Sequence, residues 1–252
     1  MWEFIANIFY QLLFFFYRLF GGNLGFSIIA VTLLIKFLLL PLVIPTIKSA
    51  KKMQDLKPAL DKLKAKYSDK TKLQQAQLEL YKQHGINPAA GCLPQIVQIV
   101  ILIALYQVFI KFLGQGEISG ITVNPNFFWL NLNQPDQYYI LPILAGVSQF
   151  VFSLMMQSGL ETHVKNPKSK PAKQKEEDKL EMAQSMQTQM VYMMPIMTTV
   201  ISLRFQSGLV LYWVISTVFS LIQQYYFSGW GGLTPFLNRF GILKVNNTNG
   251  QS

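Results

Sequence analysis

The chain lacks much of what a soluble enzyme or a disulfide-stabilised protein contains. Of its 252 residues only 13% are charged, about half of the roughly 25% that is typical of soluble globular domains. Acidic residues number 12 against 22 basic ones, and the net charge is +10. The single cysteine, Cys92, excludes an intrachain disulfide and a metal site built from several cysteines. With 51% apolar residues, this composition indicates a membrane protein with basic segments outside the bilayer.

Sequence motifs of several enzyme classes are also missing. The chain contains no GxxxxGK[ST] phosphate loop, no HExxH zinc helix and no GxSxG nucleophile turn. Ser27 and Lys36 are nine residues apart, about 13 Å of rise on one helix, which is too far for a Ser–Lys catalytic pair. We therefore expect no enzymatic activity and no cofactor, so that any work must come from binding energy, the membrane potential or a partner.

Long apolar runs are the feature that the sequence has in abundance. A bilayer core of roughly 30 Å requires about 20 apolar residues in a helix. Five stretches approach or reach that length: 24–45, 90–113, 138–158, 190–206 and 208–228. The fourth is short and is followed almost at once by the fifth, so these two are expected to form a tight antiparallel hairpin. The predicted fold class is an all-α membrane protein with five transmembrane helices.

The distribution of lysine and arginine predicts how these spans are oriented. Cytoplasmic segments carry the excess of basic residues, and both 46–89 and 159–189 are rich in lysine. Segment 114–137 contains Glu117 and Asp136 but no basic residue. We therefore expect the N-terminus outside, the C-terminus inside and residues 229–252 as a cytosolic tail.

The segments around the spans differ in kind. Residues 1–23 are strongly aromatic, which favours a helix in the membrane interface over a sixth span, the competing interpretation. In 46–89, apolar residues recur at helical spacing on both sides of a polar break at 68–71, which predicts an antiparallel helical hairpin in the cytosol. Pro58 falls where its second helical piece begins. The 159–189 segment, rich in Lys, Glu and Pro, is typical of a flexible linker.

Lys36 is the most informative single residue. It lies near the centre of the first span, about 18 Å of helix from Leu24, so its ammonium group cannot easily reach either surface. Such a lysine costs roughly 2.5–3.5 kcal/mol to insert and is tolerated where it faces protein or water. No Asp or Glu occurs in the five spans, which favours a water-filled cavity. A structural ion pair and an uncharged lysine are the alternatives.

Other polar residues are candidates for the wall of this cavity. Thr32 precedes Lys36 by one helical turn and shares its face. Gln98 lies in the second span, and Thr217 belongs to a polar series in the fifth. The alternative role for each is an ordinary hydrogen bond between membrane helices. Pro41 removes one helical hydrogen bond and is expected to kink the inner half of the first span.

The order of several motifs resembles the YidC/Oxa1/Alb3 membrane protein insertases. The resemblance covers roughly residues 1–228, and its motifs are Gly25-Phe26-Ser27-Ile28-Ile29 with Lys36 and Pro41-Leu42, Asn87-Pro88 with Gly91-Cys92 and Pro94, Phe128-Trp129-Leu130 with Pro135-Asp136 and Tyr138-Tyr139-Ile140-Leu141-Pro142, Met193-Met194-Pro195, and Ser207-Gly208-Leu209-Val210-Leu211-Tyr212-Trp213 with Ile222-Gln223-Gln224. The chain looks like a short bacterial form, which implies a multi-pass protein of the bacterial cell membrane.

The resemblance implies a five-helix core (24–228) around a groove that opens to the cytosol and to lipid and is closed outside. It also implies wall residues, which we expect to be Lys36, Thr32, Gln98, Trp213 and Thr217, with Trp213 taken from the family motif. Two departures stand out. Lys36 replaces the family's usual arginine and so lacks its bidentate fork, and Gln206 stands where proline is common.

The expected function is insertion and chaperoning of membrane proteins without ATP hydrolysis. The expected partners are nascent membrane proteins, the lipid bilayer, a ribosome contacted through the lysine-rich 48–82 hairpin, and a Sec-type translocon. An anionic lipid surface is the alternative partner for that hairpin. A small ion or solute transporter that uses Lys36 as an anion site is the competing function, and a structural scaffold that does not need this charge is a third.

Overall fold

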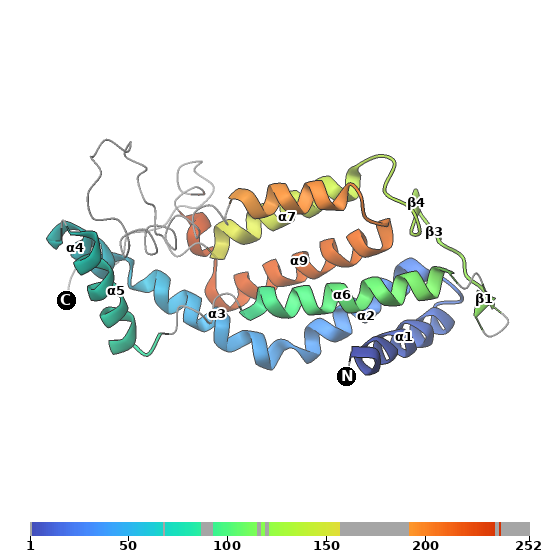
Figure 1. Cartoon of the computed structure of the whole chain (residues 1–252), viewed down its shortest axis with the longest axis horizontal. Helices are drawn as coiled ribbons and strands as arrows, with labels where there is room; N and C mark the ends of the chain where they lie inside the picture. Colours follow the sequence, from blue (N-terminus) through green and yellow to red (C-terminus); the bar gives the residue numbers. More distant parts are fainter. Residues whose placement is uncertain are drawn as a thin grey trace.

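The computed structural model describes residues 2–67, 69–86, 93–114, 117–118, 121–156, 192–234 and 237. It is mostly helical. The helices of the main bundle lie side by side along the long axis of the molecule (Figure 1); they are α2 (Leu24–Leu38), α3 (Leu40–Asp55), α6 (Leu93–Gly114), α7 (Ile140–Met156), the helix Tyr192–Ser202 and α9 (Ser207–Ser228). The predicted linker at 159–189 and nearly all of the tail beyond residue 234 lie outside the described residues.

These helices fall on the five predicted apolar stretches, with α2 and the start of α3 sharing the first, but their lengths differ from the prediction. Within the described part of the chain, α9 alone is long and apolar enough to cross a membrane by itself, and the bent pair α2–α3 gives a second candidate. The apolar helices Ile96–Phe112, Ile140–Met156 and Tyr192–Ser202 are shorter. The 17 residues of α7, for example, rise by about 26 Å, a few ångströms less than a bilayer core of about 30 Å.

The first predicted span is two helices rather than one. Helices α2 and α3 meet at Leu39 with a bend of 65°. Pro41 lies in the first turn of α3. In an unbroken helix it would have no N–H to donate to the Phe37 carbonyl, and its ring would clash with that carbonyl. The predicted kink is therefore confirmed, and it divides the segment close to Lys36.

Helix α1 (Trp2–Leu19) packs against α2 and α6. Gly21 and Gly22 turn the chain between α1 and α2, with φ values of 63° and 84° that favour glycine. The Tyr17 ring is buried against Phe112, and its hydroxyl accepts a hydrogen bond from the Asn124 N–H at 3.0 Å. The placement of α1 in the membrane interface stays a prediction.

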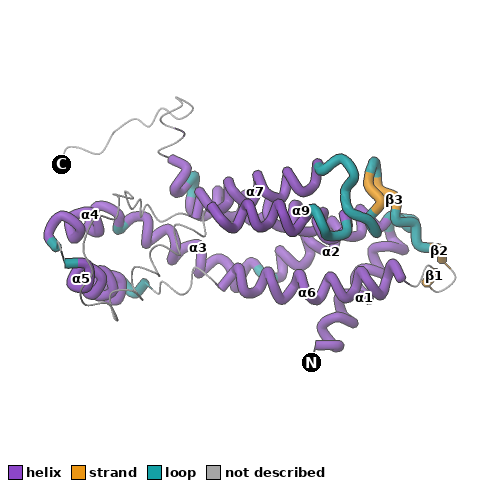
Figure 2. The backbone as a smooth tube through the Cα atoms, turned by 45° about the horizontal axis from the view of Figure 1, so that its top comes forward, coloured by secondary structure: helices purple, strands orange, loops and turns teal. Residues whose placement is uncertain are grey.

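The helical hairpin that the sequence predicts is formed by α4 (Lys57–Lys66) and α5 (Lys70–Gln83), which pack together beyond the end of α3 (Figure 2). Pro58 is in the first turn of α4 as expected. A small core of its own holds the hairpin to the end of α3: Met53, Leu60, Tyr81 and Ile86 are buried together. Burial in this core raises the pKa of the Tyr81 hydroxyl.

Two short antiparallel β-hairpins at the opposite end of the bundle were not predicted (Figure 1). β1 (Glu117–Ile118) pairs with β2 (Ile121–Thr122), and β3 (Asn126–Phe127) pairs with β4 (Leu130–Asn131). Strands of two residues are too short to show the alternating pattern by which strands are recognised in a sequence.

This end of the bundle is closed by backbone contacts. The Ser207 N–H and hydroxyl both donate to the Gln134 carbonyl, at 2.8 and 2.6 Å, and the Gly208 N–H donates to Leu132 at 3.1 Å. The start of α9 is thereby tied to the β4–α7 connection. The buried Asp136 carboxylate caps α7, accepting hydrogen bonds from the N–H groups of Tyr138 and Leu141.

Candidate functional site: the Lys36 cavity

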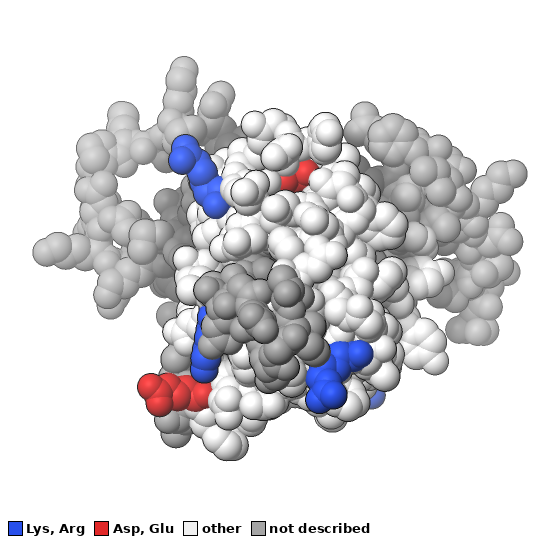
Figure 3. Space-filling model, turned by 90° about the vertical axis from the view of Figure 1, so that its right-hand side faces the viewer, with Lys and Arg blue, Asp and Glu red and all other residues white. Residues whose placement is uncertain are grey.

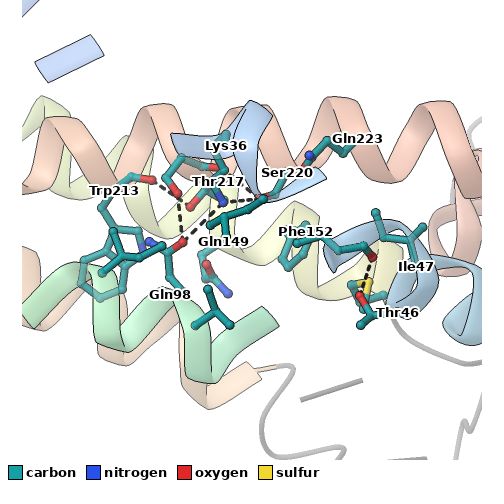
Figure 4. Close-up of a pocket in the computed structure, with 16 residues that line it drawn as sticks. Lys36, Thr46, Ile47, Gln98, Gln149, Phe152, Trp213, Thr217, Ser220 and Gln223 are labelled. Atoms are coloured by element: carbon teal, nitrogen blue, oxygen red, sulfur yellow. Dashed lines mark hydrogen bonds between the residues drawn. The ribbon is translucent and has the colours of Figure 1, made fainter. Parts of the chain in front are cut away.

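Lys36 points from the last turn of α2 into a polar network between α2, α6 and α9 (Figure 4). Its ammonium group donates to Ser220 Oγ at 2.9 Å and to Gln98 Oε1 at 3.4 Å. Both acceptors are neutral, so the network spreads the charge of Lys36 without cancelling it. An ammonium group has three donors, and these two hydrogen bonds leave one N–H for another acceptor.

Gln98 is held in one orientation by two further groups. Its Nε2 donates to the Tyr212 hydroxyl at 2.9 Å, and its Oε1 accepts from Ser216 Oγ at 3.0 Å. Tyr212 is 1% exposed and Ser216 is equally buried. Because the amide nitrogen is taken up by Tyr212, the amide oxygen is the atom that faces Lys36. Tyr212 therefore positions the acceptor for Lys36 without touching Lys36 itself.

The network opens into a cavity of about 90 Å³. One water molecule needs roughly 10–15 Å³ measured in this way, so the cavity has room for several. The part of the cavity around Lys36 is polar. The part away from Lys36 is lined by apolar and weakly polar side chains of the α2–α3 bend, α3 and α7; these include Leu39, Val43, Thr46, Ile47, Phe152 and Met156. Lys36 is the one charged residue among the described lining residues.

The structure brings together four of the five predicted site residues. Lys36, Gln98, Trp213 and Thr217 all line the cavity (Figure 4). Thr32 does not: it is 1% exposed, one turn away from Lys36, and its hydroxyl donates to the Ile28 carbonyl of its own helix. Thr217 bonds in the same way to the Trp213 carbonyl but still borders the cavity.

Further polar side chains line the cavity, among them Gln223 of the polar series in the fifth predicted span and Gln149, which was not expected. Gln149 in α7 is 7% exposed and lines the cavity, although the sequence analysis did not single it out; an amide inside an otherwise apolar span was the available signal. Gln223 lines it as well, and its buried Nε2 has no hydrogen-bond partner within the described part of the chain. A water molecule in the cavity would satisfy that donor.

Comparisons with known proteins agree with this architecture. The family of the 60Kd inner membrane proteins matches residues 15–230. The membrane protein insertase YidC 2 of Bacillus anthracis is 39% identical over 224 residues, which cover 87% of this chain and 77% of the relative. The membrane protein insertase YidC of Fusobacterium nucleatum is 40% identical over 206 residues, or 81% of this chain and 86% of the relative.

This chain belongs to the YidC/Oxa1 family of membrane protein insertases. Among solved structures, the crystal structure of an active YidC insertase with its first transmembrane domain resolved is similar, with a TM-score of 0.58 and 25% sequence identity. That match covers 87% of this chain and 46% of the other. YidC insertases are multi-pass proteins of the plasma membrane, and the insertase family is not enzymatic.

Within this YidC-type framework, the position of Tyr212 leads to a first prediction. Tyr212→Phe removes the acceptor of the half-buried Gln98 amide, and an unsatisfied donor costs up to about 1–3 kcal/mol when it is buried. We expect a lower midpoint of thermal unfolding in detergent and weaker insertion. Tyr106→Phe in α6, where the ring is 42% exposed, is the matched control and should change neither. Unaltered stability in Tyr212→Phe would show that Gln98 does not depend on this hydroxyl.

Proposed function

We propose that the Lys36 cavity receives the polar segment of a nascent membrane protein on its way across the bilayer. The observation that carries this proposal is a charged ammonium group in a cavity whose described lining contains no acid. Two neutral acceptors hold the group in place, and its remaining N–H is available to a carboxylate or carbonyl of the client. A polar segment in this cavity keeps hydrogen-bond partners that lipid would deny it.

The proposal includes the arrangement in the membrane that the sequence predicts. The predicted stretches 24–45, 90–113, 138–158, 190–206 and 208–228 cross the bilayer as five spans, with the N-terminus outside and α4–α5 in the cytosol. The 65° bend between α2 and α3 supports this arrangement, because α3 then leads from the bundle to the hairpin α4–α5 (Figure 1). The contacts of Ser207 and Gly208 with the β4–α7 connection support closure at the other end.

The apolar segment of the client then passes from the cavity into lipid. Exposed apolar side chains lie on α2 and on α6; they include Phe37, Leu38, Ile99 and Ile103. In a bilayer these side chains contact acyl chains. A client helix beside them therefore moves from an apolar protein surface into apolar lipid. No external energy source is needed for that step, which fits the absence of a nucleotide-binding motif.

Crosslinking tests the proposed route. A photoreactive residue at Thr217 or Gln98 should label the polar segment of an arrested single-span client, whereas one at the lipid-facing Ile103 should label its apolar segment. The same client carrying no polar translocated segment is the control for the cavity positions. Labelling confined to Ile103, with none at Thr217 or Gln98, would overturn the proposal.

We further propose that the hairpin α4–α5 receives the translating ribosome. Lysines are concentrated on it, and exposed basic residues bind RNA phosphates with a strong dependence on salt. Lys62, Lys66, Lys72 and Lys82 are the exposed lysines of this hairpin among the residues with described side chains.

Co-sedimentation with ribosomes that carry a nascent membrane protein tests this contact. Changing these four exposed lysines to glutamine should reduce binding at low salt and make the remaining binding less sensitive to salt. Lys111→Gln, on α6 and outside the hairpin, is the control. Unchanged co-sedimentation after the fourfold substitution would contradict a ribosome contact and leave anionic lipid as the partner.

A further inference from the structure

Two aromatic residues at the closed end of the bundle have an unfavourable backbone conformation. Phe128 has φ 51° and Tyr139 has φ 58°, and these are the non-glycine residues with positive φ in the described part of the chain. This conformation costs a bulky residue about 1–3 kcal/mol, and it persists only when the surrounding structure enforces it. The side chains gain little packing in return, since Phe128 is 78% exposed and Tyr139 is 57% exposed.

Their neighbours in sequence are exposed aromatic residues as well. Trp129 follows Phe128 at the tip of the β3–β4 hairpin, and Tyr138 precedes Tyr139; they are 49% and 66% exposed. We call these four residues, Phe128, Trp129, Tyr138 and Tyr139, the outer aromatic surface. The described surface of this end of the molecule is mostly uncharged, with scattered basic and acidic residues (Figure 3).

Two independent observations place the outer aromatic surface at the level where helices begin. Phe127, next to Phe128, packs on the first turn of α2: its ring lies 5.3 Å from that of Phe26 and leaves no room for a side chain at Gly25. Tyr139 immediately precedes Ile140, the first residue of α7. In a multi-pass protein the beginning of an apolar helix marks the boundary between hydrocarbon and headgroups, where Trp and Tyr are enriched.

We propose that the outer aromatic surface binds the headgroup region of the outer leaflet and anchors the closed end of the bundle there. The strained backbone at Phe128 and Tyr139 directs the rings away from the protein core, and the bilayer supplies the contacts that the core does not. Anchoring fixes the β4–α7 connection, which holds the start of α9 through Ser207 and Gly208. The choice of leaflet rests on the orientation given under the proposed function.

The depth of Trp129 in the membrane tests the proposal. The full chain, with Trp2, Trp213 and Trp230 changed to Phe, is placed in nanodiscs that contain lipids carrying a fluorescence quencher near the headgroup or deep in the acyl chain. We expect the headgroup-proximal quencher to be the more effective one and water-soluble acrylamide to have limited access. Free quenching by acrylamide together with no effect of either lipid label would overturn the proposal, as would stronger quenching by the deep label.

Phe128→Gly separates anchoring from folding. Glycine accepts the positive φ without strain, so thermal stability in detergent should be retained or raised, while quenching of Trp129 by the headgroup-proximal label is lost. Phe128→Tyr, which keeps an interfacial ring, should retain that quenching. Retained quenching in Phe128→Gly would overturn the role of this ring. None of these measurements involves a client, so failure of the Lys36 mechanism leaves their outcome unchanged.

Discussion

Replacing Lys36 by alanine is expected to reduce insertion of a client with an acidic translocated segment about tenfold or more, whereas Lys36→Arg retains most of it. A hydrogen bond to a charged group contributes about 1.5–3 kcal/mol, and each 1.4 kcal/mol corresponds to a factor of ten. Alanine removes the charge and also leaves Ser220 and Gln98 without their shared donor. Arginine keeps the charge and adds donors in a planar fork.

The measurement is protease protection of a single-span client in liposomes that contain the purified protein alone. A client whose translocated segment has asparagine in place of aspartate is the control, because it should lose less from Lys36→Ala than the acidic client does. Equal impairment by alanine and arginine would show that the shape of the lysine site matters more than its charge. Full insertion activity of Lys36→Ala would show that insertion does not need the charge of Lys36 and would favour a scaffold role.

A solute transporter predicts a different result from the same preparation. If Lys36 bound a small anion in transit, liposomes with the purified protein would show flux of that anion that depends on Lys36, with no client present. The neutral acceptors Gln98 and Ser220 suit either occupant. The family relationship, however, is to membrane protein insertases over most of the chain.

Periodicity and charge were enough to predict most of the helices and the location of the polar cavity. A lysine in the middle of an apolar run is tolerated only where it faces protein or water, so Lys36 by itself predicts a polar cavity. The positions of Gln98 and Thr217 followed from their occurrence on other apolar helices. Pro41 likewise indicated a break in the first span, because the missing N–H and the bulk of the ring act locally.

Features that depend on contacts between distant segments were harder to predict. Thr32 shares a helical face with Lys36, yet the sequence does not show that its hydroxyl bonds to Ile28 and stays off the cavity wall. The role of Tyr212 required knowing which hydroxyl reaches the Gln98 amide across 114 residues of sequence. The β3–β4 hairpin depends on Phe127 packing against Gly25, a contact that no local pattern indicates.

The largest expected effect on folding comes from Gly146 in α7. A Cβ at this position would overlap Thr199 Oγ1 on the helix Tyr192–Ser202, and the hydroxyl of Thr199 is fixed by donating to the Pro195 carbonyl at 2.9 Å. Small residues allow membrane helices to approach closely, and overpacking of such a contact costs about 1–3 kcal/mol. Gly146→Ala should therefore lower the midpoint of thermal unfolding by several degrees, since about 2–4 °C correspond to 1 kcal/mol in a chain of this size.

A second substitution tests whether this contact is the cause. Thr199→Ala removes the overlapping oxygen, and the nearest remaining neighbours of a Cβ at Gly146 are the Cβ of residue 199 at 3.3 Å, a tight contact, and the Pro195 carbonyl oxygen at 3.5 Å. The double variant Gly146→Ala/Thr199→Ala should therefore be more stable than Gly146→Ala alone. Val147→Ile adds a methyl group to the exposed side of the same helix and is the matched control. If the double variant has a midpoint of thermal unfolding no higher than that of Gly146→Ala, the loss of stability arises within α7 itself. Close packing against Tyr192–Ser202 would then not explain the glycine.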